Sequence, residues 1–361
     1  MPAPRPTIDP QGPVAPVDKA WEAWFARRLY DERDIYFVRI AAAILLHALP
    51  GLVLFYGGFL PWWLLLVWAP YFFFKYVGPY TLMLHAVCHR PIFRREHKAL
   101  EGVLSWVIGP LFGHTPGSFY VHHVGMHHPE NNLPQDLSTT MPYERDSFVS
   151  FLHYWARFFF TGQLHLVRYL KQRKRSKLMW KFVWGELSWF TALGLLLWAN
   201  LPVTFLLFVV PFLMLRVFMM SGNFGQHAFV DPERPHSAFG NSTNLLNHRY
   251  NRKCHNDGYH IVHHIKPALH WTEMPAWYED RLDEFGREDA LVFDGLGNNQ
   301  VVWWCLMTKN YDRLARHVVD LPGAPVRSHE EKIAWLQSRT RTPIGRRLGI
   351  LELAPSPVRS R

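Results

Sequence analysis

Four long apolar stretches constrain this chain more than any other feature of its sequence. Each approaches the roughly 20 residues that an α-helix needs to cross the hydrocarbon core of a bilayer. Two short uncharged turns, around residues 59–61 and 200–202, join the stretches into two hairpins. The sequence therefore predicts an all-α integral membrane protein with four transmembrane helices. The predicted spans cover about residues 40–60, 62–84, 185–198 and 202–220.

Charge is distributed unevenly about these hairpins. The chain carries 39 Lys and Arg against 29 Asp and Glu, a formal net charge of +10. Nearly all the basic residues lie in the segments outside the uncharged turns, and such segments remain in the cytosol. We therefore expect both termini and the loop over residues 85–184 to be cytosolic. The basic run over residues 171–181 precedes an apolar stretch and is typical of a flank on anionic lipid. No nucleic-acid recognition motif accompanies it, so we expect no nucleic-acid partner.

The rest of the chain divides by composition. Residues 1–17 hold six prolines, which remove backbone donors at short intervals and predict a disordered tail. Residues 18–35 predict an interfacial helix with aromatic side chains near one face. Residues 36–275 are expected to form one domain, in which the four spans carry a cytosolic helical cap. Residues 276–361 are expected to form a cytosolic C-terminal region.

Three histidine clusters, with sequences HAVCH, HHVGMHH and HNDGYHIVHH, stand out among the 21 histidines of the chain. Side chains four residues apart on an α-helix project from one face, so both imidazoles of such a pair can reach one metal. On this spacing His123 and His127 are expected to share a face, with His128 turned toward a neighbouring site. All three clusters fall on segments assigned to the same side of the membrane. The candidate ligands in them are His85, His89, His123, His127, His128, His260, His263 and His264.

The number of candidate ligands predicts two metal ions, because one zinc ion would need only four of the eight. Imidazole suits iron, zinc, copper or nickel, so ligand type alone does not identify the metal. Zinc hydrolases place a catalytic carboxylate inside the motif, as in HExxH, and none of the three clusters has one. Neutral imidazoles beside lipid favour redox-active iron that acts on a hydrocarbon.

Over about residues 36–275 this arrangement resembles the membrane fatty-acid desaturase superfamily, which also includes hydroxylases, alkane monooxygenases and alkene-forming fatty-acid decarboxylases. The matching elements are the three histidine boxes and the segment from Asn223 to His227. The resemblance implies two iron ions, O2 as co-substrate and a fatty-acid or fatty-acyl substrate. It also implies that His227 is a ninth ligand and that Asn223 contacts the metal through water.

Two departures from the family pattern bear on the reaction. The central box reads HxxxHH, which is closer to hydroxylase and alkane-monooxygenase spacing than the HxxHH of many desaturases. No haem-binding HPGG motif is present, so we expect a separate electron donor of the ferredoxin, rubredoxin or cytochrome type, with a reductase.

Three outcomes follow from abstraction of hydrogen from a substrate C–H bond. A second abstraction gives a double bond, oxygen rebound gives an alcohol, and loss of CO2 from a free fatty acid gives a terminal alkene. We favour desaturation and retain decarboxylation and hydroxylation as alternatives. A histidine-rich metal transporter is the alternative from a different class, but it predicts ligands inside the spans, where only His47 lies.

Supporting roles are predicted for acidic residues and histidines near the boxes. Carboxylates commonly orient ligating histidines, and the candidates for this role are Glu130, Asp136 and Asp257. Three further histidines flank the boxes as spare ligands, proton relays or hydrogen-bonded loop residues. They are His122, His255 and His270.

Overall fold

The computed structural model describes residues 6–12 and 14–341 of the chain. Its backbone divides into two compact units. Unit 1 consists of Met1–Gln11, Gly125–Lys174 and Phe218–Arg361, and unit 2 consists of Gly12–Val124 and Arg175–Val217. Most of both units is helical, as predicted.

Three helices in the described part of the chain are long and apolar enough to cross a membrane. They are Glu32–Tyr56, which covers most of the predicted first span, and Ser176–Ala199 and Leu201–Gln226, which contain the predicted third and fourth spans. The second predicted span also forms a helix, α3 (Leu65–His89), but it is not among the three. Lys75 and several tyrosines interrupt its apolar sequence and lower its hydropathy. By length and composition, three of the four predicted spans are therefore found as candidate membrane helices.

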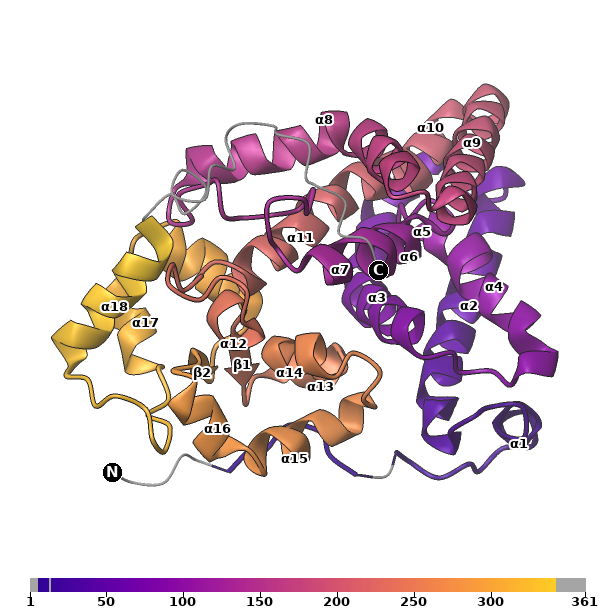
Figure 1. Ribbon diagram of the computed structural model, residues 1–361. Coiled ribbons are helices and arrows are strands. Elements are labelled where there is room, and N and C mark those ends of the chain that lie inside the picture. Colours follow the sequence, from indigo (N-terminus) through magenta and orange to yellow (C-terminus); the bar gives the residue numbers. More distant parts are fainter. Residues whose placement is uncertain (1–5, 13, 342–361) are drawn as a thin grey trace. The chain divides into compact units, whose positions relative to one another are not determined.

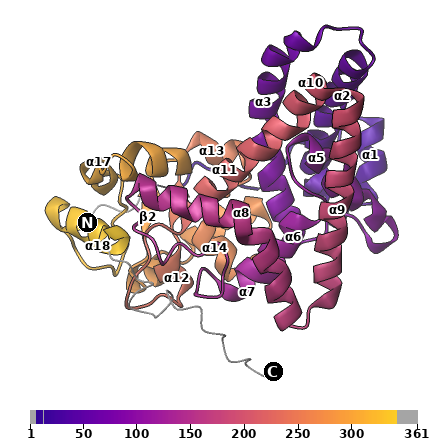
Figure 2. The ribbon, with the colours of Figure 1, turned by 90° about the horizontal axis from the view of Figure 1, so that it is seen from above.

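Unit 2 is built on long helices, seen in Figure 2 as α2 (Ile35–Tyr56), α3 and α9 (Ser176–Ala199). A cluster of buried apolar side chains that includes Phe55, Leu65 and Trp189 packs the two predicted hairpins together. One polar contact also joins the hairpins, because the hydroxyls of Tyr56 and Thr204 hydrogen-bond at 2.7 Å.

The other elements of unit 2 are short, and several join end to end into longer helices with a local change of pitch. They are α1 (Ala20–Ala26), η1 (Glu32–Asp34), η2 (Trp62–Leu64), η3 (Arg95–Leu100), α4 (Glu101–Val103), η4 (Leu104–Ile108), α5 (Gly109–Leu111), α6 (Ser118–His122), α10 (Leu201–Thr204) and η6 (Phe205–Val209). Two elements contain a unit boundary, namely η5 (His123–His127) and α11 (Val210–Gln226).

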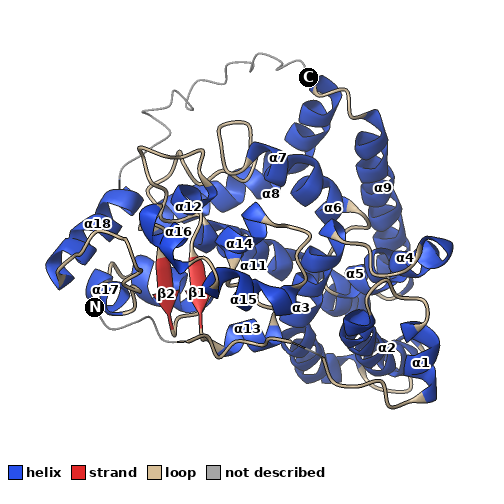
Figure 3. Cartoon of the chain, turned by 60° about the horizontal axis from the view of Figure 1, so that its bottom comes forward, coloured by secondary structure: helices blue, strands red, loops and turns tan. Residues whose placement is uncertain are grey.

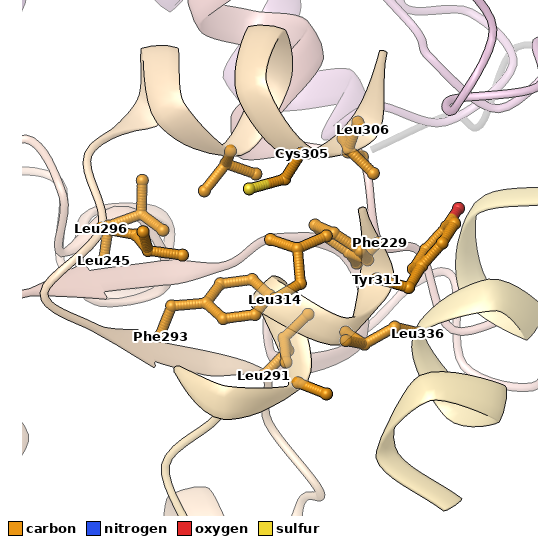
Figure 4. Close-up of a cluster of buried hydrophobic side chains, with 13 residues drawn as sticks. Phe229, Leu245, Leu291, Phe293, Leu296, Cys305, Leu306, Tyr311, Leu314 and Leu336 are labelled. Atoms are coloured by element: carbon orange, nitrogen blue, oxygen red, sulfur yellow. The ribbon is translucent and has the colours of Figure 1, made fainter. Parts of the chain in front are cut away.

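Unit 1 contains a small parallel sheet, which corrects the all-α expectation. Strand β1 (Asn244–Leu246) pairs with β2 (Val292–Asp294), so that Leu245 lies opposite Phe293 (Figure 3). Both side chains are buried in an apolar core with Phe229. Figure 4 shows this core, in which the sheet packs against side chains of the C-terminal helices.

The helices of unit 1 are mostly short as well (Figure 1). They are α7 (His128–Glu130), α8 (Phe148–Gln172), α12 (Ala238–Asn241), α13 (Arg249–Lys253), α14 (His260–Ile265), η7 (Trp271–Glu273), α15 (Met274–Glu279), α16 (Leu282–Arg287), η8 (Gln300–Leu306), α17 (Tyr311–Arg316) and α18 (His329–Arg341).

The ends of the chain are described in part. Of the predicted tail over residues 1–17, residues 1–5 and 13 lie outside the described residues, as do residues 342–361 of the predicted C-terminal region. Residues 6–12 form no helix or strand, yet the Asp9 side chain is buried. The predicted interfacial helix over residues 18–35 contains α1 and η1.

A close backbone approach in unit 2 generates a stability prediction. A methyl group added at Gly185 on α9 would overlap the carbonyl oxygen of Pro116, which is backbone and cannot move aside cheaply. We expect Gly185→Ala to destabilise the detergent-solubilised protein by about 1–3 kcal/mol, as overpacking does. Thermal unfolding followed by tryptophan fluorescence measures this loss.

Gly194→Ala on the same helix is the matched control, because nothing lies within 4 Å of the added methyl group. We expect the stability of this variant to stay within about 1 kcal/mol of wild type. Equal effects of the two substitutions would contradict the close packing of α9 on Pro116.

Candidate metal centre

Four histidines of unit 1 bring their ring nitrogens together. They come from three segments: His127 ends η5 within the central box, His227 follows α11, and His260 and His264 lie one turn apart on α14. One nitrogen from each ring lies within 4.8 Å of the corresponding nitrogen of every other. The Nε2 atom of His260 is 3.1 Å from Nε2 of His227 and 3.1 Å from Nε2 of His264. We call this group the four-histidine group.

These separations are those of ligands around one ion. Two imidazole nitrogens bound to a metal at about 2.1 Å are about 3.0–3.4 Å apart in octahedral or tetrahedral geometry. His127, His227 and His260 are buried, and His264 is partly buried. The donor set of the four-histidine group therefore fits a transition-metal ion held by neutral imidazoles.

The protonation state of the rings agrees with this assignment. Burial, with His127 as a neighbour, lowers the pKa of His227 to about 4. Burial and the surrounding histidines also lower the pKa of His264. Both imidazoles are therefore neutral at neutral pH, which is the form that binds a metal.

Asp136 fixes the orientation of His127. A carboxylate oxygen of Asp136 lies 2.6 Å from Nδ1 of His127, so that Nε2 is the nitrogen that would bind a metal. The same carboxylate accepts from the backbone and the hydroxyl of Ser138 and from the backbone of Asn132. This carboxylate–histidine pair is typical of metal sites.

Asn241 holds His227 in a corresponding way, and the sequence analysis did not identify it. The Asn241 carbonyl oxygen is 2.8 Å from Nδ1 of His227, and its side-chain oxygen accepts from Asn132 at 3.0 Å. Thr140 donates to the His227 carbonyl oxygen at 2.6 Å. Asn241 is far from every histidine box in the sequence, so no spacing pattern points to it.

The central box departs from the expected helical geometry. Its residues His123–His127 form a π-helix, whose hydrogen bonds join residues five apart, in place of the expected α-helix. His127 belongs to the four-histidine group of unit 1, whereas His123 lies against His85 and His89 in unit 2. His123 and His127 therefore belong to different groups of histidines, although their spacing suggested that both could reach one metal.

The remaining predicted ligands form two smaller sets, each within its own unit. In unit 2 the ring centroids of His85 and His89 lie 4.4 and 4.9 Å from that of His123. In unit 1 the Nε2 atoms of His128 and His263 are 2.9 Å apart. All nine predicted ligands thus lie near at least one other.

The other residues near the boxes have identifiable partners. Asn223 donates to the Ser138 carbonyl oxygen at 2.9 Å and to the Tyr154 hydroxyl at 2.7 Å, so it is linked to the residues that hold His127. Asp257 accepts from Gln226, which precedes His227, and from Tyr250. Glu130 accepts from Tyr169 and Arg173, so its observed role is to tie α7 to α8.

The three flanking histidines lie outside the clusters just described. His270 shares a 2.7 Å hydrogen bond with the Thr272 hydroxyl and caps η7. The His255 ring packs on Trp271, and His122 ends α6. Of the predicted alternatives, His270 thus has the contacts of a hydrogen-bonded loop residue.

Comparison with known proteins gives one match. Residues 62–295 match the family model described as fatty acid desaturase. This region covers more than half of the chain and includes all nine predicted histidine ligands. No curated protein and no solved structure matches the chain.

The contact between Asp136 and His127 generates a prediction. Asp136→Asn removes the negative charge that fixes the His127 ring, and such changes typically weaken metal binding about 10–100-fold. We expect this variant to lose metal to a competing chelator faster than wild type. Metal content after timed exposure to the chelator measures the effect.

Glu130→Gln is the control, because Glu130 also follows the central box but bonds to α8. We expect this variant to retain metal as wild type does. If Asp136→Asn and Glu130→Gln behave alike, Asp136 does not support a metal ligand.

Proposed function

We propose that this chain, which belongs to the fatty acid desaturase family, is an iron-dependent oxidoreductase that uses O2 to desaturate a fatty-acid or fatty-acyl chain. The observation that carries the proposal is the four-histidine group, whose nitrogens converge within the region matched by the family. The carboxylate of Asp136 on His127 adds the outer support that a metal site needs.

The proposed number of iron ions is two. The four-histidine group would hold the first ion. Five predicted ligands remain outside this group, and their number exceeds what one ion needs, which supports a second ion. Bound iron would supply the activation of O2 that removes hydrogen from an unactivated C–H bond.

The residues of the chain orient the ligands and control their protons. The Asp136 carboxylate accepts a hydrogen bond from Nδ1–H of His127, and the Asn241 carbonyl oxygen accepts one from Nδ1–H of His227. Both contacts direct Nε2 toward the other histidines. Burial of the two rings excludes water, and burial also keeps His227 neutral by lowering its pKa.

The proposed location is the cytosolic side of a membrane, with both termini in the cytosol. Three apolar helices support membrane association, and the asymmetry of basic residues supports the orientation. α3 would act as the fourth span despite its lower hydropathy. A fatty-acyl substrate dissolved in the bilayer would then lie close to the enzyme. We propose a separate donor of the ferredoxin, rubredoxin or cytochrome type for the electrons.

The family match and the place of the histidines favour an enzyme over a metal transporter. A transporter requires ligands along a path through the membrane. His227, His260 and His264 lie beyond the last helix that could span one, which ends at Gln226.

The iron content of the purified protein tests the proposed metal centre. We expect about two iron ions per chain, because nine histidines exceed the ligand number of one site. Elemental analysis of protein reconstituted with iron measures the content. A value near one would contradict the second ion, and zinc retained with full activity would contradict iron.

Single substitution of a ligand tests the reaction. We expect His264→Ala to abolish oxygen consumption with fatty acids, because it removes one member of the four-histidine group. His270→Ala is the control, since its ring bonds to Thr272, and it should retain activity.

Gas chromatography of the products identifies the outcome in the active protein. An internal double bond supports desaturation. A terminal alkene one carbon shorter than the substrate would indicate decarboxylation instead, and an alcohol would indicate hydroxylation.

A further inference from the structure

The segment Thr7–Gln11 lies against the rest of unit 1, close to the turn that precedes α14. In Figure 1 the indigo N-terminal segment runs beside α15. The backbone and hydroxyl of Thr7 both donate to the Glu279 carboxylate at the end of α15, at 2.8 and 2.7 Å. The backbone of Ile8 donates to the Asn247 side chain at 2.7 Å. Thr7 and Ile8 are therefore hydrogen-bonded to later parts of unit 1.

Asp9 makes the most demanding of these contacts. Its side chain is only 5% exposed, and burial raises its pKa. One carboxylate oxygen accepts three hydrogen bonds, from the backbone of Asn247 at 2.7 Å, the Asn251 amide at 3.0 Å and the Tyr259 hydroxyl at 2.9 Å. A buried carboxylate is costly unless several donors satisfy it, so this arrangement is specific.

The partners of Asp9 and Pro10 shape the turn that precedes α14. Asn251 accepts from the backbone of Gly258, and Asn256 has a left-handed backbone with φ of 54°. The Asn256 amide donates to the Pro10 carbonyl oxygen at 2.8 Å. The N-terminal segment therefore contacts this turn through Asn251, Asn256 and Tyr259.

This turn also positions the histidines of α14, because it leads directly into that helix. Tyr259 immediately precedes His260, and its carbonyl oxygen accepts from the backbone of His263 at 2.9 Å. α14 has only six residues, which is too short to be stable without tertiary contacts. The buried Tyr259 ring and its hydroxyl are such contacts at the start of the helix.

We propose that Asp9 is a positioning residue for the metal centre, and that Thr7–Gln11 holds α14 so that His260 and His264 stay in the four-histidine group. The inference rests on the proposed function, because it takes those histidines as ligands. It assigns a role in metal retention to a segment that contains none of the nine predicted ligands.

The test compares two substitutions of Asp9 in the full-length protein loaded with cobalt(II), whose visible spectrum reports the ligand geometry. Asp9→Ala removes the acceptor of all three hydrogen bonds, and we expect cobalt loss to a chelator to be about 10–100 times faster than in wild type. Asp9→Asn keeps one side-chain oxygen as acceptor, so we expect a rate within a few-fold of wild type and an unchanged spectrum.

Two further variants separate positioning from general stability. Tyr259→Phe removes only the hydroxyl donated to Asp9, and we expect faster cobalt loss even if Asp9→Ala does not fold. Leu314 lies in the apolar core of unit 1, so Leu314→Ala lowers stability without changing any contact of Thr7–Gln11. We expect it to retain cobalt at a temperature well below its own unfolding transition.

The outcomes distinguish this inference from the proposed function. If wild type binds no cobalt, or His264→Ala binds it as wild type does, the metal centre itself is wrong. If wild type binds cobalt through His264 but both Asp9→Ala and Tyr259→Phe release it at the wild-type rate, the positioning role alone is wrong. Equal acceleration in Leu314→Ala would also overturn it.

Discussion

The convergence of four imidazoles is the constraint on which the rest of unit 1 depends. Their nitrogens come within 4.8 Å of one another, although His127 and His264 are far apart in the sequence. A ring in this position has to be buried, neutral and fixed in one orientation. For His227 and His264, burial also supplies the second condition, because it disfavours the protonated form and lowers their pKa. Orientation needs a partner on the other ring nitrogen, which Asp136 and Asn241 provide for His127 and His227.

Those partners are held in turn by buried polar residues rather than by the apolar core. Asn132 bonds to Asp136 through its backbone and to Asn241 through its side chain, so it connects the supports of two ligands. The fully buried Arg145 donates to the carbonyl oxygens of Ala228, next to His227, and of Arg339 on α18. Through Arg145, α18 is thus linked by hydrogen bonds to the backbone next to His227. A network of this kind is rigid only when every member is bonded.

The sequence pointed to the histidines that converge in the structure, but not to the residues that hold them, for a physical reason. Histidine spacing on a helix is a local property, so the boxes could be identified from the sequence alone. The π-helix at His123–His127 could not, because its pitch depends on tertiary contacts that favour it over an α-helix. Asn241 and Asp9 act through contacts with residues distant in the sequence. The three-residue strands β1 and β2 are too short to give a period-two pattern.

These supports also bear on how metal binding is coupled to folding. An ion that joined His127, His227 and α14 would close loops of about 30 to 100 residues, and ordering such loops opposes binding. In unit 1 the Asp136 and Asn241 contacts and the N-terminal segment already fix these segments through protein hydrogen bonds. Most of the conformational entropy of these segments is then lost when the protein folds, and little is lost when the metal binds. A metal site organised in this way can bind its ion tightly with neutral ligands alone, because little conformational entropy remains to be lost.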